Sequence, residues 1–312
     1  MDWLSSLLDI VPVSGRLETR CLYAAPWRLA LGESSPGEIP YHIVVEGAAM
    51  LDDPFGGSPK RLNTGDILLL SHGRAHTLHD GSGAPPSPAH PHVSLNLIID
   101  QNKGTGASLD MLCGRFILTP PHDRLLSDYL PDDLVIRSGG HSTDAGAQLS
   151  ALIALMRKEA TQETLGGHAM LNALSAAMFA LALRVASESK TVPTGLLSVV
   201  SQPRLAPALT AMLQDPGHPW TLPELARLCH MSRATFVRHF QQSMGRSATD
   251  LLMEIRMTLA AHELRRSSAS VSVVAEAAGY QSDAAFQRAF KQHMGVTPAR
   301  WRREGLAAGE SV

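Results

Sequence analysis

Two arginines occupy equivalent positions in a short sequence motif that occurs twice in the chain. Arg238 lies midway between two phenylalanines that are four residues apart, and Arg288 lies in the same way between two phenylalanines fifty residues further on. Since residues four apart share one helix face, the phenylalanines should face the core and the arginines should point away from it. A guanidinium group can donate two hydrogen bonds to the O6 and N7 atoms of guanine. The spacing therefore indicates contact with the edges of DNA bases.

The repeated phrase has the pattern of a helix with a defined beginning and end. A serine that can cap the first turn, apolar residues at every fourth position and a final glycine recur in both copies: Ser232, Phe236, Phe240, Met244 and Gly245, then Ser282, Phe286, Phe290, Met294 and Gly295. A short helix-like run and a turn precede each copy. This order predicts two helix-turn-helix units whose second helices enter the major groove of neighbouring stretches of one duplex. Duplication for packing alone is the alternative, because the phenylalanines are core residues in either case.

The charges are divided unevenly along the chain. Residues 203–303 contain 13 Lys and Arg against 7 Asp and Glu, a net charge of +6, whereas residues 1–202 contain 14 against 20, a net charge of −6. The overall charge of −2 therefore conceals a basic C-terminal segment. A basic module on an acidic body is the electrostatic signature of a nucleic-acid-binding domain, so the distribution favours DNA binding over packing alone.

The segment Trp220–Trp301 resembles the AraC/XylS family of transcriptional regulators. Its matching stretches are TLPELARLCHMSRATFVRHFQQSMG and VVAEAAGYQSDAAFQRAFKQHMGVTPARWRR, and the run AGYQSDAAFQRAFKQHMGVTPA is close to the family signature. The resemblance implies seven helices, of which the first lies near Pro203–Gln214. Capping-box patterns beginning at Thr221 and at Ser247 predict two of the helix starts from the residues themselves.

In this family, base contacts come from the exposed face of each recognition helix. By position, the resemblance implies that the base-contacting residues are Ala234, Val237 and Arg238 in the first helix, and Asp283, Ala284, Gln287 and Arg288 in the second. Glutamine suits adenine, whereas valine and alanine reach only the methyl group of thymine. Three further cations are predicted to neutralise phosphates, with solvated surface charges as the alternative: Arg233, Arg246 and Lys291.

Length and composition limit the rest of the chain. With 312 residues, of which 44% are hydrophobic, the chain can build two cores. Three cysteines do not make an extracellular disulfide framework, and the N-terminal MDWLSSLLDIVPV lacks the basic start of a signal peptide. The longest apolar candidate, residues 168–186, is broken by polar residues and falls short of the roughly 18–20 apolar residues that span a bilayer. We expect a cytoplasmic protein without a membrane segment.

The first 120 residues are typical of strands and turns. The predicted strands are Ile39–Leu51 with a break at Glu46-Gly47, Ile67–Leu70, Val93–Ile99 and Leu109–Leu118. The spacing of Gly65, Gly73, His76 and Asp80 resembles the second motif of cupin β-barrels. A cupin followed by helices and this DNA-binding segment resembles the cupin-bearing AraC regulators over nearly the whole chain.

The histidines raise the question of a metal site. Enzymatic cupins place two His and a Glu on the first motif and another His on the second, whereas this chain offers His42, with Val44 in the second histidine's place, and His76. Two imidazoles without a carboxylate make a poor transition-metal site, although histidines between residues 72 and 92 could add ligands. We predict no metal and no cofactor, with His42 and His76 as weak metal candidates. The alternative is a cupin metal-binding protein or enzyme whose helical tail serves association.

The family resemblance extends to two cysteines. A subgroup of these cupin regulators that responds to oxidants, including reactive chlorine, carries one cysteine near the N-terminus and another in a barrel strand, and ETRCLYAAPW and LCGRFIL are similar to it. The resemblance implies that Cys21 and Cys113 form a redox pair, with Cys21 in an N-terminal segment that is free to move. Arg20 and Arg115 would favour the thiolates if they lie close. The alternative is two unremarkable thiols, and Cys229 is predicted to be a buried core thiol.

Residues 144–202 are predicted to be helical. Apolar residues at alternating spacings of three and four form a coiled-coil-like seam: Leu171, Leu174, Met178, Leu181 and Val185. This seam either pairs with the same helix of a second subunit or packs on the barrel. A flexible joint is predicted at Lys190–Gly195.

These observations predict an α+β chain with two domains. The predicted parts are a cupin-like sensory domain over residues 1–143, a helical spacer over 144–202, an all-α double helix-turn-helix domain over 203–303 and a flexible tail over 304–312. The expected function is sequence-specific DNA binding in transcription regulation, without enzymatic activity, controlled by the N-terminal domain. The expected partners are double-stranded DNA, RNA polymerase, a second subunit in a homodimer, and a small-molecule or oxidant effector, with no membrane.

Overall fold

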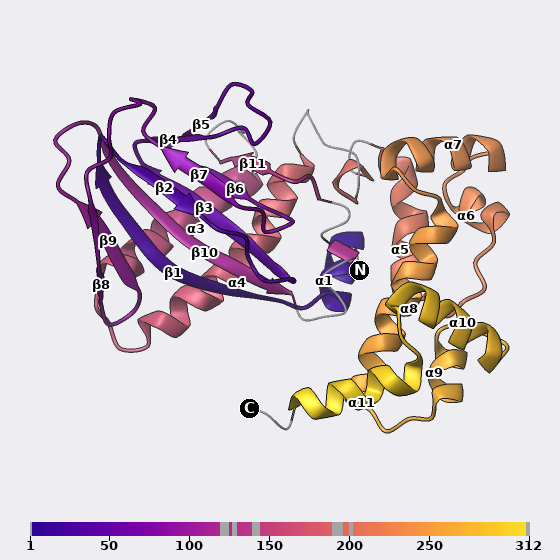
Figure 1. Cartoon of the computed structure of the whole chain (residues 1–312). Helices are drawn as coiled ribbons and strands as arrows, with labels where there is room; N and C mark the ends of the chain where they lie inside the picture. Colours follow the sequence, from indigo (N-terminus) through magenta and orange to yellow (C-terminus); the bar gives the residue numbers. More distant parts are fainter. Residues whose placement is uncertain are drawn as a thin grey trace. The chain divides into compact units, whose positions relative to one another are not determined.

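The computed structural model describes residues 2–118, 125–126, 130–138, 144–188, 196–199 and 202–309. Its contacts divide the chain into two compact units. One unit is built on Val13–Leu118 and Leu130–Val192, and the other on Met1–Pro12, Thr119–Tyr129 and Pro193–Val312. The predicted α+β class with two domains, one rich in strands and one helical, is confirmed (Figure 1).

Two β-sheets form the first unit (Figure 1). The strands are β1 (Val13–Ala24), β2 (Arg28–Leu31), β3 (Glu38–Glu46), β4 (Ala48–Leu51), β5 (Lys60–Asn63), β6 (Asp66–Leu69), β7 (His76–His79), β8 (Ala89–Val93), β9 (Ile98–Asn102), β10 (Ser108–Leu118) and β11 (Leu134–Arg137). The seven-stranded sheet has the order β11-β6-β3-β10-β1-β9-β8, and the four-stranded sheet has the order β2-β7-β4-β5. Buried residues of both sheets form one core, which includes Leu62, Leu68, Leu78 and Met111.

The strand predictions are mostly confirmed and in one place wrong. The predicted break at Glu46-Gly47 separates β3 from β4, and Gly47 has the positive φ of 92° that a side chain would resist. The predicted strand Val93–Ile99 is instead a hairpin corner, since β8 ends at its first residue and β9 begins at Ile98. There the Ser94 backbone amide and hydroxyl both donate to the carbonyl of Leu97, which closes the turn.

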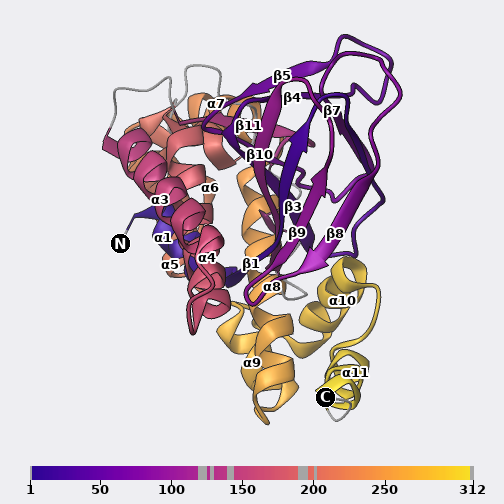
Figure 2. The ribbon, with the colours of Figure 1, turned by 90° about the vertical axis from the view of Figure 1, so that its left-hand side faces the viewer.

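Two long helices cover one face of the larger sheet (Figure 2). These are α3 (Asp144–Thr161) and α4 (Gly167–Ser187), which pack on each other, with α4 lying along β1. Phe179 of α4 packs against Phe116 with ring centroids 4.6 Å apart, and the Ser175 hydroxyl lies 2.7 Å from that of Tyr41. These contacts come from one side of α4, which therefore seats the helix on its own sheet.

The predicted apolar seam of α4 also faces the interior of this unit. Its members Leu171, Met178 and Val185 are buried, and the other two are half-buried. The structure therefore agrees with packing on the sheet, and pairing with a second subunit stays a prediction. The prediction that this segment falls short of a membrane span is wrong by length and composition, since α4 is long and apolar enough to cross a membrane. The core helices of soluble proteins pass the same test.

The second unit is helical. Its elements are α1 (Trp3–Ile10), η1 (Leu196–Val199), η2 (Pro203–Leu205), α5 (Ala206–Gln214), α6 (Leu222–Leu228), α7 (Arg233–Met244), α8 (Ala248–Arg266), α9 (Val271–Ala277), α10 (Asp283–Met294) and α11 (Pro298–Gly309). The seven helices α5 to α11 confirm the number that the family resemblance implies. Thr221 and Glu224 form the predicted capping box at the start of α6. Ser247 caps α8, where its side chain accepts from the Asp250 amide.

Helix α1 belongs to the helical unit although it precedes the first strand. It packs against α5, and the side chains of Leu7 and Ile10 are buried. The predicted boundary assigned these residues to the sensory domain, so the observed grouping differs there. At the other end, α11 continues into the segment that was predicted as a flexible tail. The predicted joint at Lys190–Gly195 lies outside the described residues.

Candidate nucleic-acid interface and thiol cluster

The two helix-turn-helix units have the same turn. After α6, His230 takes a left-handed conformation with φ of 52°, and after α9 Gly279 does so with φ of 78°. The next residue closes each turn with an equivalent 2.9 Å hydrogen bond, from the Met231 amide to the Ala226 carbonyl and from the Tyr280 amide to the Ala275 carbonyl. The extra residue of the second unit, Gln281, stands just before the capping serine. The backbone of the repeat is thus conserved between the two copies in spite of the insertion.

Helix α7 presents its predicted residues to solvent. Ser232 caps the helix and Gly245 ends it with a left-handed φ of 71°. Phe236 and Phe240 are fully buried, so the opposite face is the free one. The exposed residues on it include Arg233, Ala234, Val237 and Arg238.

Helix α10 repeats this arrangement. Ser282 caps it, Gly295 ends it, and Phe286 and Phe290 are buried. The exposed residues include Asp283, Ala284, Gln287, Arg288 and Lys291. The carboxylate of Asp283 accepts a hydrogen bond from the hydroxyl of Ser272 on α9, so it also joins the two helices of the unit.

One predicted phosphate contact is already paired within the protein. The Arg246 guanidinium lies 3.0 Å from the carboxylate of Glu254, whose side chain is only 4% exposed. A buried carboxylate needs such a partner, because an unpaired charge in the interior is costly. This arginine therefore has a structural task, whereas Arg233 and Lys291 extend from exposed positions.

The two cysteines named as a redox pair lie side by side. Cys21 stands in β1 and Cys113 in the adjacent β10, and their sulfur atoms are 3.8 Å apart. Both thiols are free, Cys21 is buried and Cys113 is partly exposed. The expectation that Cys21 lies in a mobile N-terminal segment is wrong, because β1 is hydrogen-bonded to β10 on one side and to β9 on the other. Cys229 is buried, as predicted.

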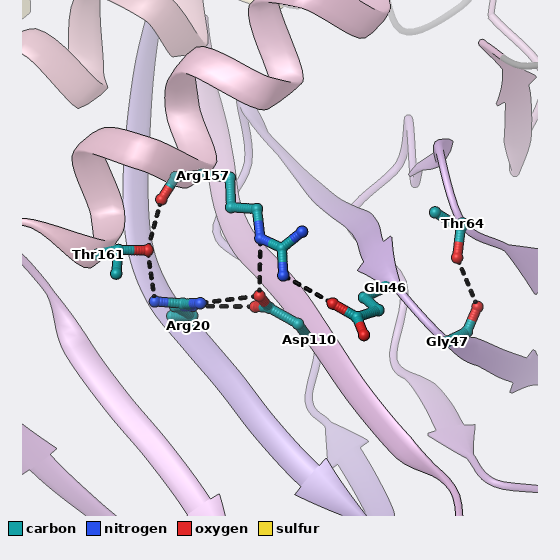
Figure 3. A network of polar contacts seen from close by, with 7 residues as sticks. All are labelled: Arg20, Glu46, Gly47, Thr64, Asp110, Arg157 and Thr161. Carbon is teal, nitrogen blue, oxygen red and sulfur yellow. Dashed lines mark hydrogen bonds and ion pairs between the residues drawn. The ribbon is translucent and has the colours of Figure 1, made fainter.

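The neighbouring arginines do not act on the thiols as expected. Arg20 makes two hydrogen bonds of 2.8 and 2.9 Å to Asp110 and a third to Thr161 of α3 (Figure 3). Since adjacent strand residues face opposite sides, Arg20 points to the helices and Cys21 to the space between the sheets. Arg115 lies 2.9 Å from Glu18 and 2.7 Å from Glu38. Carboxylates therefore neutralise both cations.

A histidine pair adjoins Cys113. The Nδ1 atom of His42 lies 3.1 Å from the Cys113 sulfur, and its Nε2 atom lies 2.8 Å from Nε2 of His76. The Nδ1 atom of His76 lies 3.0 Å from the backbone carbonyl of Arg74. Each imidazole thus has both nitrogens in hydrogen bonds. Among the described residues, no group of three His, Cys, Asp or Glu side chains is arranged to hold a metal ion.

Burial sets the protonation of this cluster. Burial, with a smaller contribution from the nearby His76, lowers the pKa of His42 to about 3. Burial also lowers the pKa of His76. The hydrogen bond to Cys21, together with burial, raises the pKa of Cys113 well above its ordinary value. At neutral pH the cluster therefore consists of neutral imidazoles and a protonated Cys113 thiol.

A cavity of about 530 Å³ opens beside the cluster. Its lining includes both cysteines, His42, His76, and the Glu18, Glu38 and Arg115 side chains. An electrophile or a small ligand in this cavity would therefore lie beside both cysteines.

The contact between His42 and Cys113 was missed by sequence reasoning. The two residues are direct cross-strand partners in the register of β3 with β10. Burial does not alternate around His42 in β3 or around Cys113 in β10, so no pattern in the sequence assigns the two residues to one face. Only the pairing of strands far apart in sequence brings them together. The sequence indicates that both segments are strands, but it does not specify the register in which they pair.

Two family models match the chain. A cupin model matches residues 2–188, which is more than half of the chain, and a helix-turn-helix domain model matches residues 225–304. The two matched segments correspond to the two units of the structure apart from α1, α5 and the residues between the units.

Relatives that match nearly the whole chain are transcriptional regulators. An uncharacterized HTH-type transcriptional regulator from Haemophilus influenzae is 30% identical over 97% of this chain and 99% of its own length. The RCS-specific HTH-type transcriptional activator RclR from Escherichia coli is 30% identical over 97% of both chains. The HTH-type transcriptional regulator MtrA from Neisseria gonorrhoeae is 28% identical over 98% of this chain and 99% of its own length.

Proposed function

The chain belongs to the AraC-type family of helix-turn-helix transcriptional regulators with an N-terminal cupin domain, and we propose that oxidation of Cys21 and Cys113 controls its binding to DNA. DNA binding and transcription regulation follow from the family. The control by thiols and the roles of single residues on DNA are the proposal.

Support for the DNA contacts comes from the equivalent faces of α7 and α10. Arg238 and Arg288 are exposed at matching positions, while the phenylalanines on either side of each are buried. The other base-contacting candidates lie on the same exposed faces. We propose that Arg238 and Arg288 read guanines and that Arg233 and Lys291 neutralise phosphates.

The 3.8 Å between the two sulfur atoms is the observation that carries the proposed redox control. A disulfide has a sulfur–sulfur bond of about 2.05 Å, so closing it requires a movement of only about 2 Å. The cavity beside both sulfurs gives an oxidant access. The related activator from Escherichia coli is named as RCS-specific, which supports an oxidant as the signal.

The signal has a short route through β1. Arg20, next to Cys21, connects this strand to Asp110 and to Thr161 at the end of α3, and Asp110 is also 3.4 Å from Arg157 of that helix (Figure 3). At its other end, β1 is separated by two residues from α1, which packs on α5 of the DNA-binding unit. A shift of β1 against β10 on disulfide formation would therefore act on both the helical cover and α1.

Footprinting of the full chain on DNA flanking its own gene, with and without hypochlorite, tests this proposal. We expect oxidant to alter the footprint, and mass spectrometry of the oxidised protein to find Cys21 joined to Cys113. Cys21→Ser should abolish the response and leave basal binding intact, with Cys229→Ser as the matched control that still responds. A full response in Cys21→Ser, or free thiols in a responding protein, would overturn the redox control.

A small-molecule effector is the second candidate for the signal. The cavity is large enough for a ligand of modest size, and Arg115, Glu18 and Glu38 give it polar groups of both signs. Isothermal titration against anionic and cationic metabolites, read together with the footprint, distinguishes this effector from an oxidant.

Four further features belong to the proposal. The chain is proposed to lack enzymatic activity, to reside in the cytoplasm away from membranes, to contact RNA polymerase and to form a homodimer. Family membership supports the first three, and the partly exposed residues of α4 are the surface available for the fourth. Sedimentation of the full chain across a concentration series tests the homodimer.

A further inference from the structure

The chain of hydrogen bonds at the histidine pair has a fixed direction. The carbonyl oxygen of Arg74 can only accept, so Nδ1 of His76 must donate to it. Because His76 is neutral, its Nε2 carries no hydrogen and accepts from Nε2 of His42. The remaining nitrogen of His42, Nδ1, is then an acceptor, and it faces the sulfur of Cys113 at 3.1 Å. The Cys113 thiol is therefore the donor at the start of the chain.

We infer that His42 and His76 form a proton relay that makes Cys113 the thiol attacking the oxidant, with Cys21 as the thiol that resolves the product. This inference rests on the proposed redox control and names the residues that carry it out. Cys21 has no comparable contact with an imidazole among the described residues, and it is the more buried of the two thiols.

Burial explains why two histidines are present. A proton that stayed on His42 would place a charge on a side chain that is 1% exposed, which is strongly disfavoured. His42 can accept the thiol proton at Nδ1 and pass its own Nε2 proton to His76. His76 is less buried and lines the cavity, so the charge ends nearer to solvent. The protein thus keeps Cys113 protonated at rest and removes its proton only during attack.

The reaction balances with a hypohalous acid as oxidant. The Cys113 sulfur attacks the chlorine of hypochlorous acid, the S–Cl bond forms and the O–Cl bond breaks, so sulfur is oxidised by two electrons. The leaving hydroxide takes one proton and departs as water, which balances the proton that the relay removes from the Cys113 thiol. Cys21 then attacks the Cys113 sulfur, the S–S bond forms and chloride leaves, while the Cys21 proton goes to water in the cavity that both sulfurs line.

Two substitutions separate proton transfer from packing. Asparagine in His42→Asn places an amide oxygen near the position of Nδ1, and glutamine in His76→Gln places an amide near Nε2, so each keeps a hydrogen bond and cannot accept a proton. His72→Asn is the matched control, because His72 is exposed and pairs with Asp132 outside the cluster. All variants are made in the full chain, and circular dichroism checks that they fold.

Stopped-flow competition with hypochlorite measures the reaction of single thiols. With Cys21→Ser and Cys229→Ser in place, we expect the rate at Cys113 to fall on the order of 100-fold in His42→Asn and in His76→Gln, the usual contribution of a general base, and to stay unchanged in His72→Asn. With Cys113→Ser instead of Cys21→Ser, the rate at Cys21 should be slow and insensitive to either relay substitution.

Two results would overturn the relay. One is an unchanged Cys113 rate in both His42→Asn and His76→Gln, and the other is a Cys21 rate that exceeds the Cys113 rate. If His42→Asn fails to fold, His76→Gln alone decides the question. Failure of the redox control would look different, since the protein with both cysteines intact would then form no Cys21–Cys113 disulfide whatever residues stand at positions 42 and 76.

Discussion

The two helix-turn-helix units share a backbone and differ in the side chains they offer to DNA. Each has a capping serine, two buried phenylalanines, a left-handed turn residue and a final glycine. At the matched exposed positions, however, Val237 of the first unit corresponds to Gln287 of the second, and Arg233 corresponds to Asp283. Among the base-contacting candidates, Arg238 matches Arg288 and Ala234 matches Ala284, so the arginines are the only identical pair that can hydrogen-bond to a base. The repeat therefore preserves the way a helix is held while its surface is free to change.

This difference assigns unequal tasks to the units. The first recognition helix has one residue at its base-facing positions that can hydrogen-bond to a base, Arg238, together with Arg233 for a phosphate. The second has Gln287 and Arg288, which suit adenine and guanine. We expect the second unit to carry more of the base discrimination and the first to contribute more of its binding through the backbone.

The second unit is also anchored by contacts of its own. Arg265 lies over the Trp301 ring at 4.0 Å, and that ring meets Phe290 edge to face. Arg256 donates to the carbonyls of Pro216 and His218 at 2.7 and 2.8 Å and lies beside the turn residue Gly279. The turn of this unit is therefore enclosed by other parts of the chain.

The largest expected effect is on that enclosed turn. In Gly279→Ala the alanine would have to keep the left-handed backbone conformation, and its methyl group would lie 2.4 Å from the Gly217 carbonyl oxygen. We expect the variant to lose about 2–3 kcal/mol of stability, from strain and overlap together. Hydrogen exchange of α9 and α10 in the full chain measures this. The control Gly295→Ala has the same strain but open space around the methyl, so it should lose about 1 kcal/mol, and equal losses would contradict the enclosure.

The arginines come next. Arg288→Ala should weaken binding to the cognate site by about 1–3 kcal/mol and relax the preference at one base pair. Arg238→Ala should do the same at a different base pair, about 10 base pairs away if the two helices enter successive turns of the groove. Selection of binding sites from a random pool gives the base profile of each variant. An unchanged profile for Arg288→Ala would remove the role implied by the family.

Gln287 and Val237 occupy equivalent positions but differ in type, so their substitution tests the unequal roles of the two units. Gln287→Ala should cost about 1 kcal/mol on the cognate site and broaden one position, because a hydrogen-bonding contact to adenine is lost. Val237→Ala at the equivalent place should leave the profile nearly unchanged. The same selection experiment measures both. If Val237→Ala broadens the profile more than Gln287→Ala, the proposed division of tasks is reversed.

The smallest effect concerns Lys291. Lys291→Ala should weaken binding evenly across all sequences and reduce the slope of log affinity against log salt by about 1, since one phosphate contact is lost. Titrations at several salt concentrations on cognate and random DNA measure the slope. A loss confined to the cognate site would make Lys291 a base contact instead.

The repeat was predictable because its signals are local. Ser232, Gly245 and their later counterparts fix helix ends by capping, and the phenylalanine spacing fixes the buried face. The cupin unit was harder to predict, because its thiol and histidine cluster depends on strand register between distant segments. The resemblance named Cys21 and Cys113 as a pair, but it placed Cys21 in a free segment instead of in β1.

The roles expected of Arg20 and Arg115 failed for a related reason. Arg20 is adjacent to Cys21 in β1 and therefore points to the opposite face of the sheet. Arg115 is two residues from Cys113 and shares its face, but its guanidinium is paired with Glu18 and Glu38. Asp110 and Glu38, which pair with these arginines, come from other strands. Likewise, α1 and α5 are about 200 residues apart in the sequence, and no local pattern predicts that they pack on each other.

The packing of α1 on α5 has a consequence for the order in which the chain can fold during synthesis. Leu7 and Ile10 leave the ribosome first, while α5 follows about 200 residues later, so at about 5–20 residues per second the helix waits roughly 10–40 seconds for its partner. During that time the apolar side chains of Leu7 and Ile10 lack the partner that buries them in the folded protein. The DNA-binding unit then completes its core only after the residues of both sheets have been translated. A nascent chain interrupted within the sheets thus yields no finished DNA-binding unit.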